Sequence, residues 1–311
     1  MGSTNDTPKP NRRDFLAQAM GLGALLSTPA RLLAQASLPT RTIPGTGEAI
    51  PVIGFGSSKP VLESPREGTE PIANVIRTLL RYGGRVVDTS WRAEEIDREF
   101  GLVLQQPELR DRLFLTSKIN TTRGEQDGID QWRQTQRLFG RRTVDLLQVE
   151  SLRGVDVHWP NLRAWKDSGE ARYIGVTVSA NRNHGPLEAF MRANSPDFVH
   201  MNYSPMENLA EERLLPLARD MGMGVLINRP FMNGSYFGMV AGKELPAWAA
   251  EFDCETWAQF SIKYVLANPA VTCVLTETTN PEHMEENIQA GFGRLPDEAT
   301  KRRMRELIRG F

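Results

Sequence analysis

The sequence predicts a single α/β domain in which eight parallel strands close into a (β/α)8 barrel, the TIM-barrel fold. Short apolar runs alternate with longer amphipathic ones eight times from residue 50 onward. Several of these runs, such as 144–149 and 271–275, are largely apolar, as parallel strands covered on both faces must be. The repeats occupy about 240 residues, close to the usual length of one such barrel.

The elements follow one another in a regular order. Runs rich in Val, Ile, Leu and Phe predict strands over 52–56, 85–90, 113–119, 144–152, 173–179, 198–204, 224–230 and 271–277. Apolar residues at helical spacing predict a helix after each strand, over 71–83, 94–106, 128–140, 159–170, 186–194, 211–222, 255–268 and 281–292. A last charged helix is expected over 296–310. Residues 41–51 are expected to form a β-hairpin that closes the amino-terminal end of the barrel.

A doubly wound parallel sheet is the alternative architecture. Such a sheet would normally carry a G-x-G-x-x-G turn after its first strand, and the segment GFGSSKP over 54–60 does not supply one. Because no linker-like segment divides the remaining chain, we expect residues 37–311 to form one domain.

Residues 1–36 are predicted to be a twin-arginine export signal cleaved after Ala36. Arg12 and Arg13 precede a mildly apolar segment, and small residues at 34 and 36 suit a signal peptidase. An amphipathic helix is the alternative, but a glycine-rich run with Pro29 suits one poorly. We therefore expect the twin-arginine translocase as a partner and a periplasmic or secreted location.

The net charge and the hydropathy of the chain argue against nucleic acid and membranes as partners. The net charge is -1, and the signal carries four basic and two acidic residues, so its removal leaves -3. Such a charge gives no strong attraction to nucleic acid or an acidic membrane. Outside the first forty residues no apolar stretch is long enough to span a membrane. No spacing suggests a metal site, and we expect Cys254 and Cys273 to be buried free thiols rather than a disulfide.

Polar residues collect where the predicted strands end, which is where barrels of this kind place their sites. They are Asp88, Lys118, Glu150, Thr177, His200, Asn202, Asn228, Arg229, Thr276 and Glu277. The Asp88–Lys118 pair is either catalytic or a structural ion pair. Trp91, after the second strand, and His158 and Trp159, in the expected loop after the fourth, either line a substrate pocket or cap the barrel.

Several of these segments resemble landmarks of the aldo/keto reductases, over residues 41 to about 296. They include VVDTS (86–90), LFLTSKI (113–119), VDLLQVESL (144–152), FVHMNYSP (198–205) and NPEHMEEN (280–287). The resemblance implies a barrel of the aldo/keto reductase type. It also implies hydride transfer from NADP(H) to a carbonyl carbon, with the proton supplied by a tyrosine. A lysine paired with an aspartate lowers the pKa of that tyrosine, and a histidine helps to hold the substrate oxygen.

Carried over by position, the aspartate is Asp88 and the lysine is Lys118. The tyrosine position is Ala93, and the histidine position is Glu150. Glu150 could give a proton if burial raised its pKa, although Lys118 nearby would favour the charged carboxylate. One branch of the family, which reduces carbon–carbon double bonds, also has glutamate here but keeps its tyrosine.

The implied nucleotide groove departs from the family as well. Thr177-Val178 replaces a Ser-Asn pair, and His200 replaces a glutamine. Asn228 replaces an aromatic residue, Thr276-Glu277 a Pro-Gly turn near the phosphates, and Asn280 a basic residue. Glu286 and Asn287 match the adenine-side pair, and Tyr203 is expected to line the groove. The NADP(H) site is therefore expected to be weakened, and ordinary NADPH-dependent carbonyl reduction is not expected.

Three functions remain open at this point. The first is an exported oxidoreductase that holds NADP(H) and uses rearranged proton donors. The second is a cofactor-free acid–base enzyme, an isomerase, lyase or hydrolase, in which Asp88, Lys118 and Glu150 converge on a small polar substrate. The third is a non-catalytic barrel whose pocket, with Trp91 and His158, holds a ligand or a protein partner.

Overall fold

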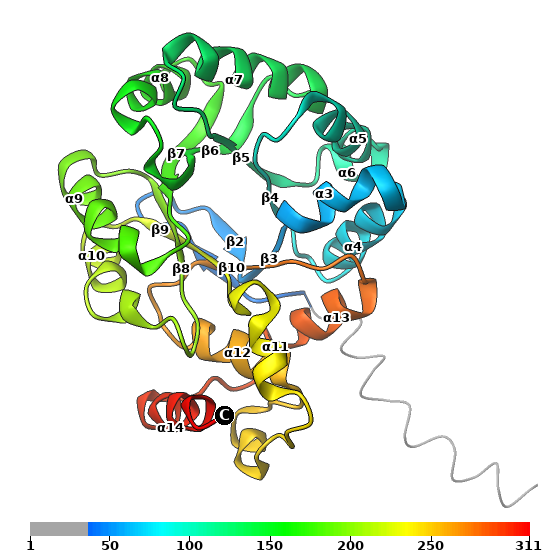
Figure 1. Cartoon of the computed structure of the whole chain (residues 1–311), viewed down its shortest axis with the longest axis vertical. Coiled ribbons are helices and arrows are strands. Elements are labelled where there is room, and N and C mark those ends of the chain that lie inside the picture. Colours follow the sequence, from blue (N-terminus) through cyan, green and yellow to red (C-terminus); the bar gives the residue numbers. More distant parts are fainter. Residues whose placement is uncertain (1–36) are drawn as a thin grey trace, which may run out of the picture. The chain divides into compact units, whose positions relative to one another are not determined.

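The computed structural model describes residues 37–311, and Leu38–Phe311 form one compact unit (Figure 1). Eight parallel strands close into a barrel in the order β10-β3-β4-β5-β6-β7-β8-β9, so the predicted barrel is confirmed. The strands are β3 (Ile53–Gly56), β4 (Val86–Asp88), β5 (Phe114–Ile119), β6 (Val144–Val149), β7 (Ala171–Thr177), β8 (Phe198–Asn202), β9 (Gly224–Asn228) and β10 (Cys273–Thr276).

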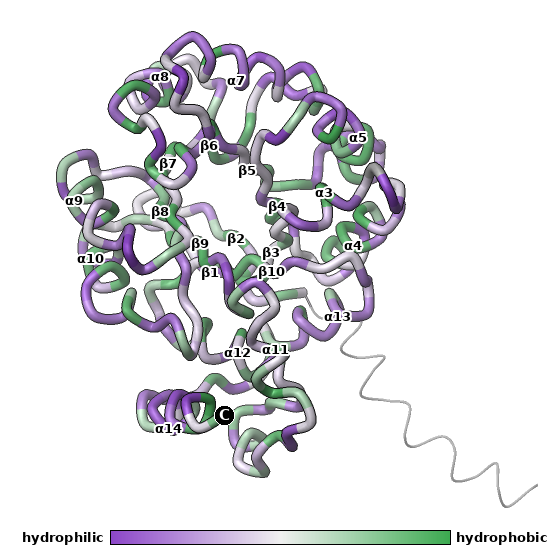
Figure 2. The backbone as a smooth tube through the Cα atoms, viewed as in Figure 1, coloured by the Kyte–Doolittle hydropathy of each residue, from purple (hydrophilic) through white to green (hydrophobic). Residues whose placement is uncertain are grey.

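Helices surround the barrel. They are α3 (Ser58–Glu67), α4 (Glu70–Arg81), α5 (Glu94–Leu104), α6 (Pro107–Arg110), α7 (Glu125–Phe139), α8 (Val155–Asp167), α9 (His184–Asn194), α10 (Leu214–Asp220), α11 (Ser235–Val240), α12 (Trp257–Leu266), α13 (Pro281–Gln289) and α14 (Glu298–Arg309). Figure 2 shows these helices with mixed hydrophobic and hydrophilic turns around the strands. In residues 37–311 no helix has both the length and the apolar character needed to cross a membrane.

The loops after the strands hold helices that the sequence pattern did not predict. The helices α3 and α11 follow β3 and β9 and precede the helices predicted over 71–83 and 255–268. The helix α8 begins at Val155, so His158 and Trp159 lie inside it rather than in a loop. All three segments lie at the carboxyl end of the barrel, and they therefore shape the rim of any site there.

The amino-terminal end of the barrel is closed by an antiparallel hairpin of β1 (Thr40–Thr42) and β2 (Ala49–Pro51), as predicted. Ile43 and Ile50 of the hairpin join a buried cluster inside the barrel with Val86, Phe114, Leu146, Tyr173, Phe198, Leu226, Cys273 and Leu275. This apolar plug leaves the carboxyl end of the barrel to hold a cavity. Cys254 and Cys273 are both buried and free, and burial raises the pKa of the Cys254 thiol to about 12.

Gly101 sets how closely α5 packs on α7. A Cβ atom at this position would lie 2.1 Å from the carbonyl oxygen of Leu138 on α7, a contact that only a backbone shift could relieve. In contrast, a Cβ atom at Gly185 in α9 would meet no heavy atom within 4 Å.

We therefore expect Gly101→Ala to lower the free energy of unfolding by roughly 2–3 kcal/mol, because overpacking outweighs the better helix propensity of alanine. The matched change Gly185→Ala should leave stability unchanged or raise it slightly. Urea denaturation followed by far-UV circular dichroism measures both. Equal stability of the two variants would contradict close α5–α7 packing as the reason for glycine.

Candidate active site

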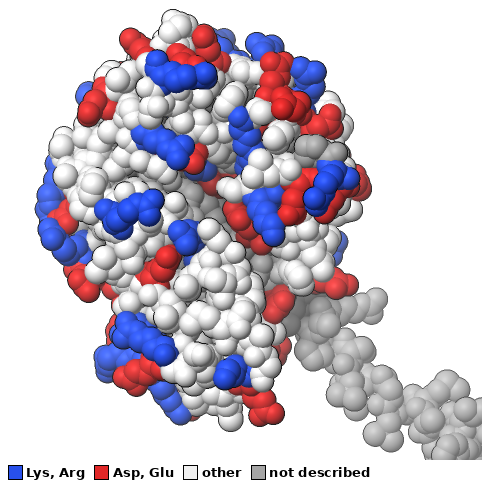
Figure 3. All heavy atoms as spheres, in the orientation of Figure 1, with Lys and Arg blue, Asp and Glu red and all other residues white. Residues whose placement is uncertain are grey.

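A cavity of ≈ 530 Å³ opens at the carboxyl end of the barrel. Every barrel strand provides one of its lining residues, either from the strand itself or directly after it: Gly56, Asp88, Lys118, Glu150, Thr177, His200, Asn228 and Leu275. Figure 3 looks onto this face and shows a hollow near its middle, with acidic and basic side chains around it. Asp88, Lys118, Glu150, Thr177 and His200, predicted from their places after the strands, thus lie in one cavity.

The floor of the cavity is a buried ion pair between Asp88 and Lys118. Lys118 Nζ lies 2.6 Å from Asp88 Oδ2 and donates a second hydrogen bond to Thr89 O at 2.7 Å. The hydroxyl of Thr116 donates to the other carboxylate oxygen. Burial opposes ionisation of Asp88, but the charge of Lys118 and these hydrogen bonds outweigh it and lower the pKa of Asp88.

Glu150 follows β6 directly and begins a 3-10 turn, η1 (Glu150–Leu152). Its half-buried carboxylate accepts a hydrogen bond from the hydroxyl of Ser90. Ser151 and Leu152 behind it hold φ values of 53° and 57°, the left-handed region that side chains rarely adopt. Strain of this kind persists where the surrounding structure enforces it, often beside functional groups. The carboxylate is thus held at the cavity wall by Ser90 and by the conformation of the turn.

His200 is the most unusual polar group in the cavity. It is 2% exposed, and neither ring nitrogen has a hydrogen-bond partner. Nδ1 lies 4.0 Å from Asp88 Oδ1. Burial lowers the pKa of His200 to about 4, although Asp88 opposes the shift, so the ring is neutral at physiological pH. Because buried polar groups nearly always have partners, this unpaired imidazole in the cavity lining is a candidate contact for a ligand or a water molecule.

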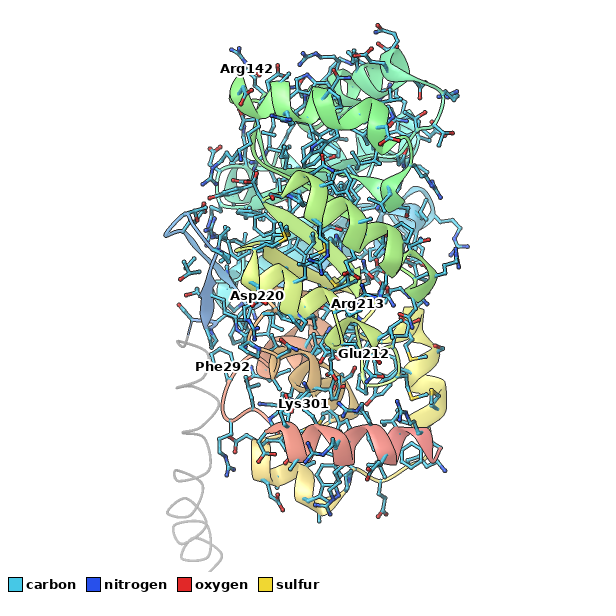
Figure 4. The ribbon with its side chains drawn as sticks, turned by 90° about the vertical axis from the view of Figure 1, so that its left-hand side faces the viewer. Arg142, Glu212, Arg213, Asp220, Phe292 and Lys301 are labelled. Atoms are coloured by element: carbon cyan, nitrogen blue, oxygen red, sulfur yellow. The ribbon has the colours of Figure 1, made fainter. Side chains whose placement is uncertain are left out.

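All five tyrosines of the chain lie within the described residues, and each hydroxyl bonds outside the cavity. The acceptors are Glu285 for Tyr82, Glu48 for Tyr173, the Trp257 carbonyl for Tyr236, and Glu211 for both Tyr203 and Tyr264. Tyr203, expected to line the nucleotide groove, is fully buried beside Tyr264. The same Glu211 forms an ion pair with Lys301 at 2.9 Å. Lys301 stands on α14 (Figure 4).

Several other predicted residues, in contrast to Asn228, Arg229 and Glu277, lie outside the cavity wall. His158 is buried in α8 with Nε2 2.9 Å from Thr121 O, and Trp159 packs edge-on against Phe190. Trp91 is half-buried and is not part of the lining. Glu286 and Asn287 lie on α13, also outside the lining. Residues 37–311 contain no group of three His, Cys, Asp or Glu side chains placed to bind a metal ion.

Sequence reasoning missed Ser90 and Arg92. The Arg92 guanidinium is almost completely buried and donates to Ser90 O at 2.8 Å, Thr89 Oγ1 at 3.1 Å and Ser57 O at 3.1 Å. It therefore ties the loop after β3 to the loop after β4. Both could have been identified from the sequence, because they follow Asp88 within four residues at the carboxyl end of a predicted strand.

The mouth of the cavity combines apolar and charged side chains. Leu62 of α3 and Phe237 of α11 line it, yet are 55% and 43% exposed. Phe231 packs against Phe237 with ring centroids 4.9 Å apart and the ring planes tilted by 45°. Arg229 and Asn233 both line the cavity with φ of 57°. The rim thus contains strained backbone at Arg229. It also carries two exposed apolar side chains, Leu62 and Phe237, which we call the apolar lip.

Residues 52–307 match the Aldo/keto reductase family. The chain belongs to this family of oxidoreductases. A 155-residue stretch, 42% of the chain, is 24% identical to the NADH-specific methylglyoxal reductase of Escherichia coli (strain K12). That stretch covers 46% of the reductase, so the chain spans about half the length of this curated relative.

Solved structures of the family share the fold. An aldo-keto reductase from Bacillus halodurans in its holo form superposes with a TM-score of 0.68 at 17% identity, over 87% of this chain and 96% of that one. An aldo-keto reductase from Klebsiella pneumoniae in complex with NADPH gives 0.70 at 17% identity, over 87% and 95%. At this identity the likeness establishes the barrel and leaves the chemistry to the residues of the cavity.

The neutral His200 predicts a specific pH dependence of stability. Its folded pKa of about 4 lies below the unfolded value of about 6.5, so between these values the unfolded chain binds a proton that the folded chain does not. The free energy of unfolding should therefore fall as pH falls through this window, by about 3 kcal/mol in total. Asp88, whose pKa is lowered, contributes stability that is lost only below about pH 4.

We expect His200→Gln to remove most of this slope in urea denaturation series between pH 6.5 and pH 4. His283→Gln, at an exposed position of α13, is the matched control and should keep the slope of the unmodified protein. A slope that survives His200→Gln would mean that the imidazole is already protonated in the folded chain.

Proposed function

We propose that this chain is an exported aldo/keto reductase family protein in which Glu150, rather than a tyrosine phenol, exchanges a proton with a small oxygen-bearing substrate. One observation carries the proposal. Glu150 shares its cavity with the Asp88–Lys118 pair, while every tyrosine hydroxyl of the chain is engaged elsewhere. Ordinary NADPH-dependent carbonyl reduction, which needs that phenol, is then not its activity.

The charges of the cavity support a weakened NADP(H) site. The lining contains three basic residues, Lys59, Lys118 and Arg229, and three acidic ones, Asp88, Glu150 and Glu277. It therefore offers no excess positive charge to a pyrophosphate and a 2′-phosphate. Glu277 stands where the family approaches the phosphates. Burial of its carboxyl at the mouth raises the pKa of Glu277, although the residue as a whole keeps an exposed surface.

The first turn of α13 supports the same proposal. The Asn280 side chain accepts a hydrogen bond from Glu282 N at 2.8 Å, so it satisfies an amide that a phosphate would otherwise bind. The helix carries Glu282, Glu285 and Glu286 and contains no Lys or Arg. These residues do not fit the phosphates of NADP(H).

The remaining groups are suited to acid–base chemistry. Glu150 accepts a proton, and Ser90 orients its carboxylate. Lys118 uses two N–H donors on Asp88 and Thr89, which leaves a third to hold a substrate oxygen that gains negative charge. Asp88 keeps this lysine charged and in place. The arrangement can therefore remove a proton next to a carbonyl group without a cofactor.

A second candidate keeps the hydride chemistry of the family, with NADP(H) loaded before export and Glu150 as the proton donor. The family membership and the NADPH complex of the Klebsiella pneumoniae neighbour favour it. It requires nucleotide affinity, so the two candidates make opposite predictions for binding.

We expect no saturable change in NADPH fluorescence when the protein is titrated to millimolar nucleotide. We also expect the protein alone to exchange the α-protons of cyclohexanone in D2O, followed by proton NMR. Glu150→Gln should reduce this exchange about 100-fold or more, the usual contribution of a general base. Glu125→Gln, at an exposed position in the first turn of α7, is the matched control. Tight NADPH binding would establish the second candidate and reject the first.

Export through the twin-arginine translocase is proposed from residues 1–36, which lie outside the described residues. Replacement of Arg12 and Arg13 by lysine keeps the charge and removes the paired arginines that the pathway reads. We expect the double variant to be retained in the cytoplasm as an uncleaved chain, detected by cell fractionation and mass spectrometry. Periplasmic recovery of the variant at the unmodified level would reject this route.

A further inference from the structure

Two proton-handling side chains face one cavity from strands that are nearly adjacent. Glu150 follows β6 and His200 lies on β8, with only β7 between them. Neighbouring strands lie about 4.8 Å apart, so the two backbone positions are separated by about 10 Å. Side chains that extend inward from both sides leave room for a short carbon unit with an oxygen on each of two carbons.

We propose that the cavity interconverts α-hydroxy ketones, which rests on the proposed role of Glu150 as the proton acceptor. The charge of the site favours this substrate class. His200 is neutral, and the charged lining residues balance three against three, so an uncharged ligand fits better than an anion. His200 Nδ1 and Lys118 Nζ lie 4.0 Å and 2.6 Å from the same Asp88 carboxylate, so an imidazole and an ammonium stand side by side and together suit a ligand with a carbonyl and a neighbouring hydroxyl.

The reaction balances without an oxidant or a reductant. The Glu150 carboxylate removes the hydrogen of the carbinol carbon as a proton, and the released electron pair forms the C=C bond of an enediolate. The N–H of His200 and the ammonium of Lys118 hold the charged oxygen. A proton then passes from the hydroxyl to that oxygen through one His200 nitrogen. The Glu150 carboxylic acid returns its proton to the other carbon, so that the carbonyl and the hydroxyl have exchanged places.

The apolar lip favours substrates that carry an apolar substituent. Leu62 and Phe237 stand on opposite segments of the mouth, α3 and α11, and remain largely exposed. Exposed apolar groups beside a polar pocket commonly mark a binding surface. A substrate with an aromatic or alkyl substituent on the hydroxy ketone would cover them while its oxygen atoms reach His200 and Lys118.

The test uses 1-hydroxy-1-phenylpropan-2-one in D2O without nucleotide. We expect NMR to show formation of 2-hydroxy-1-phenylpropan-1-one with deuterium on its carbinol carbon. Glu150→Gln should slow the reaction about 100-fold or more, and His200→Gln should slow it about 100-fold, because an amide cannot pass the proton between the two oxygens. Glu125→Gln should leave the rate unchanged. Melting curves of each variant separate a loss of activity from a loss of folding.

A second variant tests the lip independently of the proton chemistry. Phe237→Ala should raise KM for the phenyl compound about tenfold, because an apolar contact is lost. Its KM for 3-hydroxybutan-2-one, followed by deuterium exchange, should not change. Phe311→Ala is the matched control, since Phe311 is similarly exposed at 40% but packs on Trp257.

The outcomes separate this inference from the proposed function. If no isomer forms while Glu150-dependent exchange of cyclohexanone persists, the substrate class is wrong and the proposed function stands. If isomerisation is as fast in Glu150→Gln as in the unmodified protein, both this inference and the proposed function are wrong. An unchanged rate in His200→Gln overturns the passage of the proton through the imidazole.

Discussion

The buried Asp88–Lys118 pair is the interaction on which the site depends. Two charges at the floor of a barrel are costly to desolvate, and their attraction offsets that cost only when hydrogen bonds satisfy the remaining atoms. Thr116 and the Thr89 carbonyl supply those bonds. The register of β4 against β5 places Asp88 opposite Thr116, so the pair is a direct consequence of strand pairing. Removal of one partner would leave an unpaired buried charge, a loss of about 3–5 kcal/mol in comparable cases.

The same pair determines the state of its neighbours. His200 lies 4.0 Å from Asp88 and remains neutral because burial outweighs the attraction of that carboxylate for a proton. A carboxylate whose charge is already matched by Lys118 has little left to attract a second cation. Asp88 and Lys118 thus form a floor without net charge. Glu150 and the neutral imidazole of His200 lie above it and can contact a ligand.

The barrel and the floor of the site could be predicted from the sequence because both follow from strand geometry. Strands buried on both faces are apolar along their length, and the polar residues at their carboxyl ends stand out. Tyr203 was expected to line the nucleotide groove because the alternation of side chains along the strand was not taken into account. With His200 facing the cavity, a residue three positions later points to the opposite face, and Tyr203 packs outward with the helices. If alternate positions had been counted from His200, the sequence alone would have placed the Tyr203 side chain on the outer face of the barrel.

The rim was harder to predict because its conformation comes from tertiary contacts. The short helices α3 and α11 have no long periodic pattern, and Arg92 looks like any solvated arginine until the loops after β3 and β4 close around it. Residues such as Arg229 and Met232 adopt left-handed conformations that their side chains do not favour. Only the folded environment can enforce such geometry.

The proposed chemistry and the proposed location are mutually consistent. An exported protein works where soluble nicotinamide nucleotides are not supplied, so hydride chemistry there needs a nucleotide held from the time of folding. A cavity with balanced charge and with Glu277 at its mouth is poorly suited to hold one. Proton transfer by Glu150 and His200 needs no stored cofactor and returns both groups to their starting state after each turnover. With alanine at the tyrosine position and Glu150 at the histidine position, the proposed reaction consumes its substrate and no nucleotide.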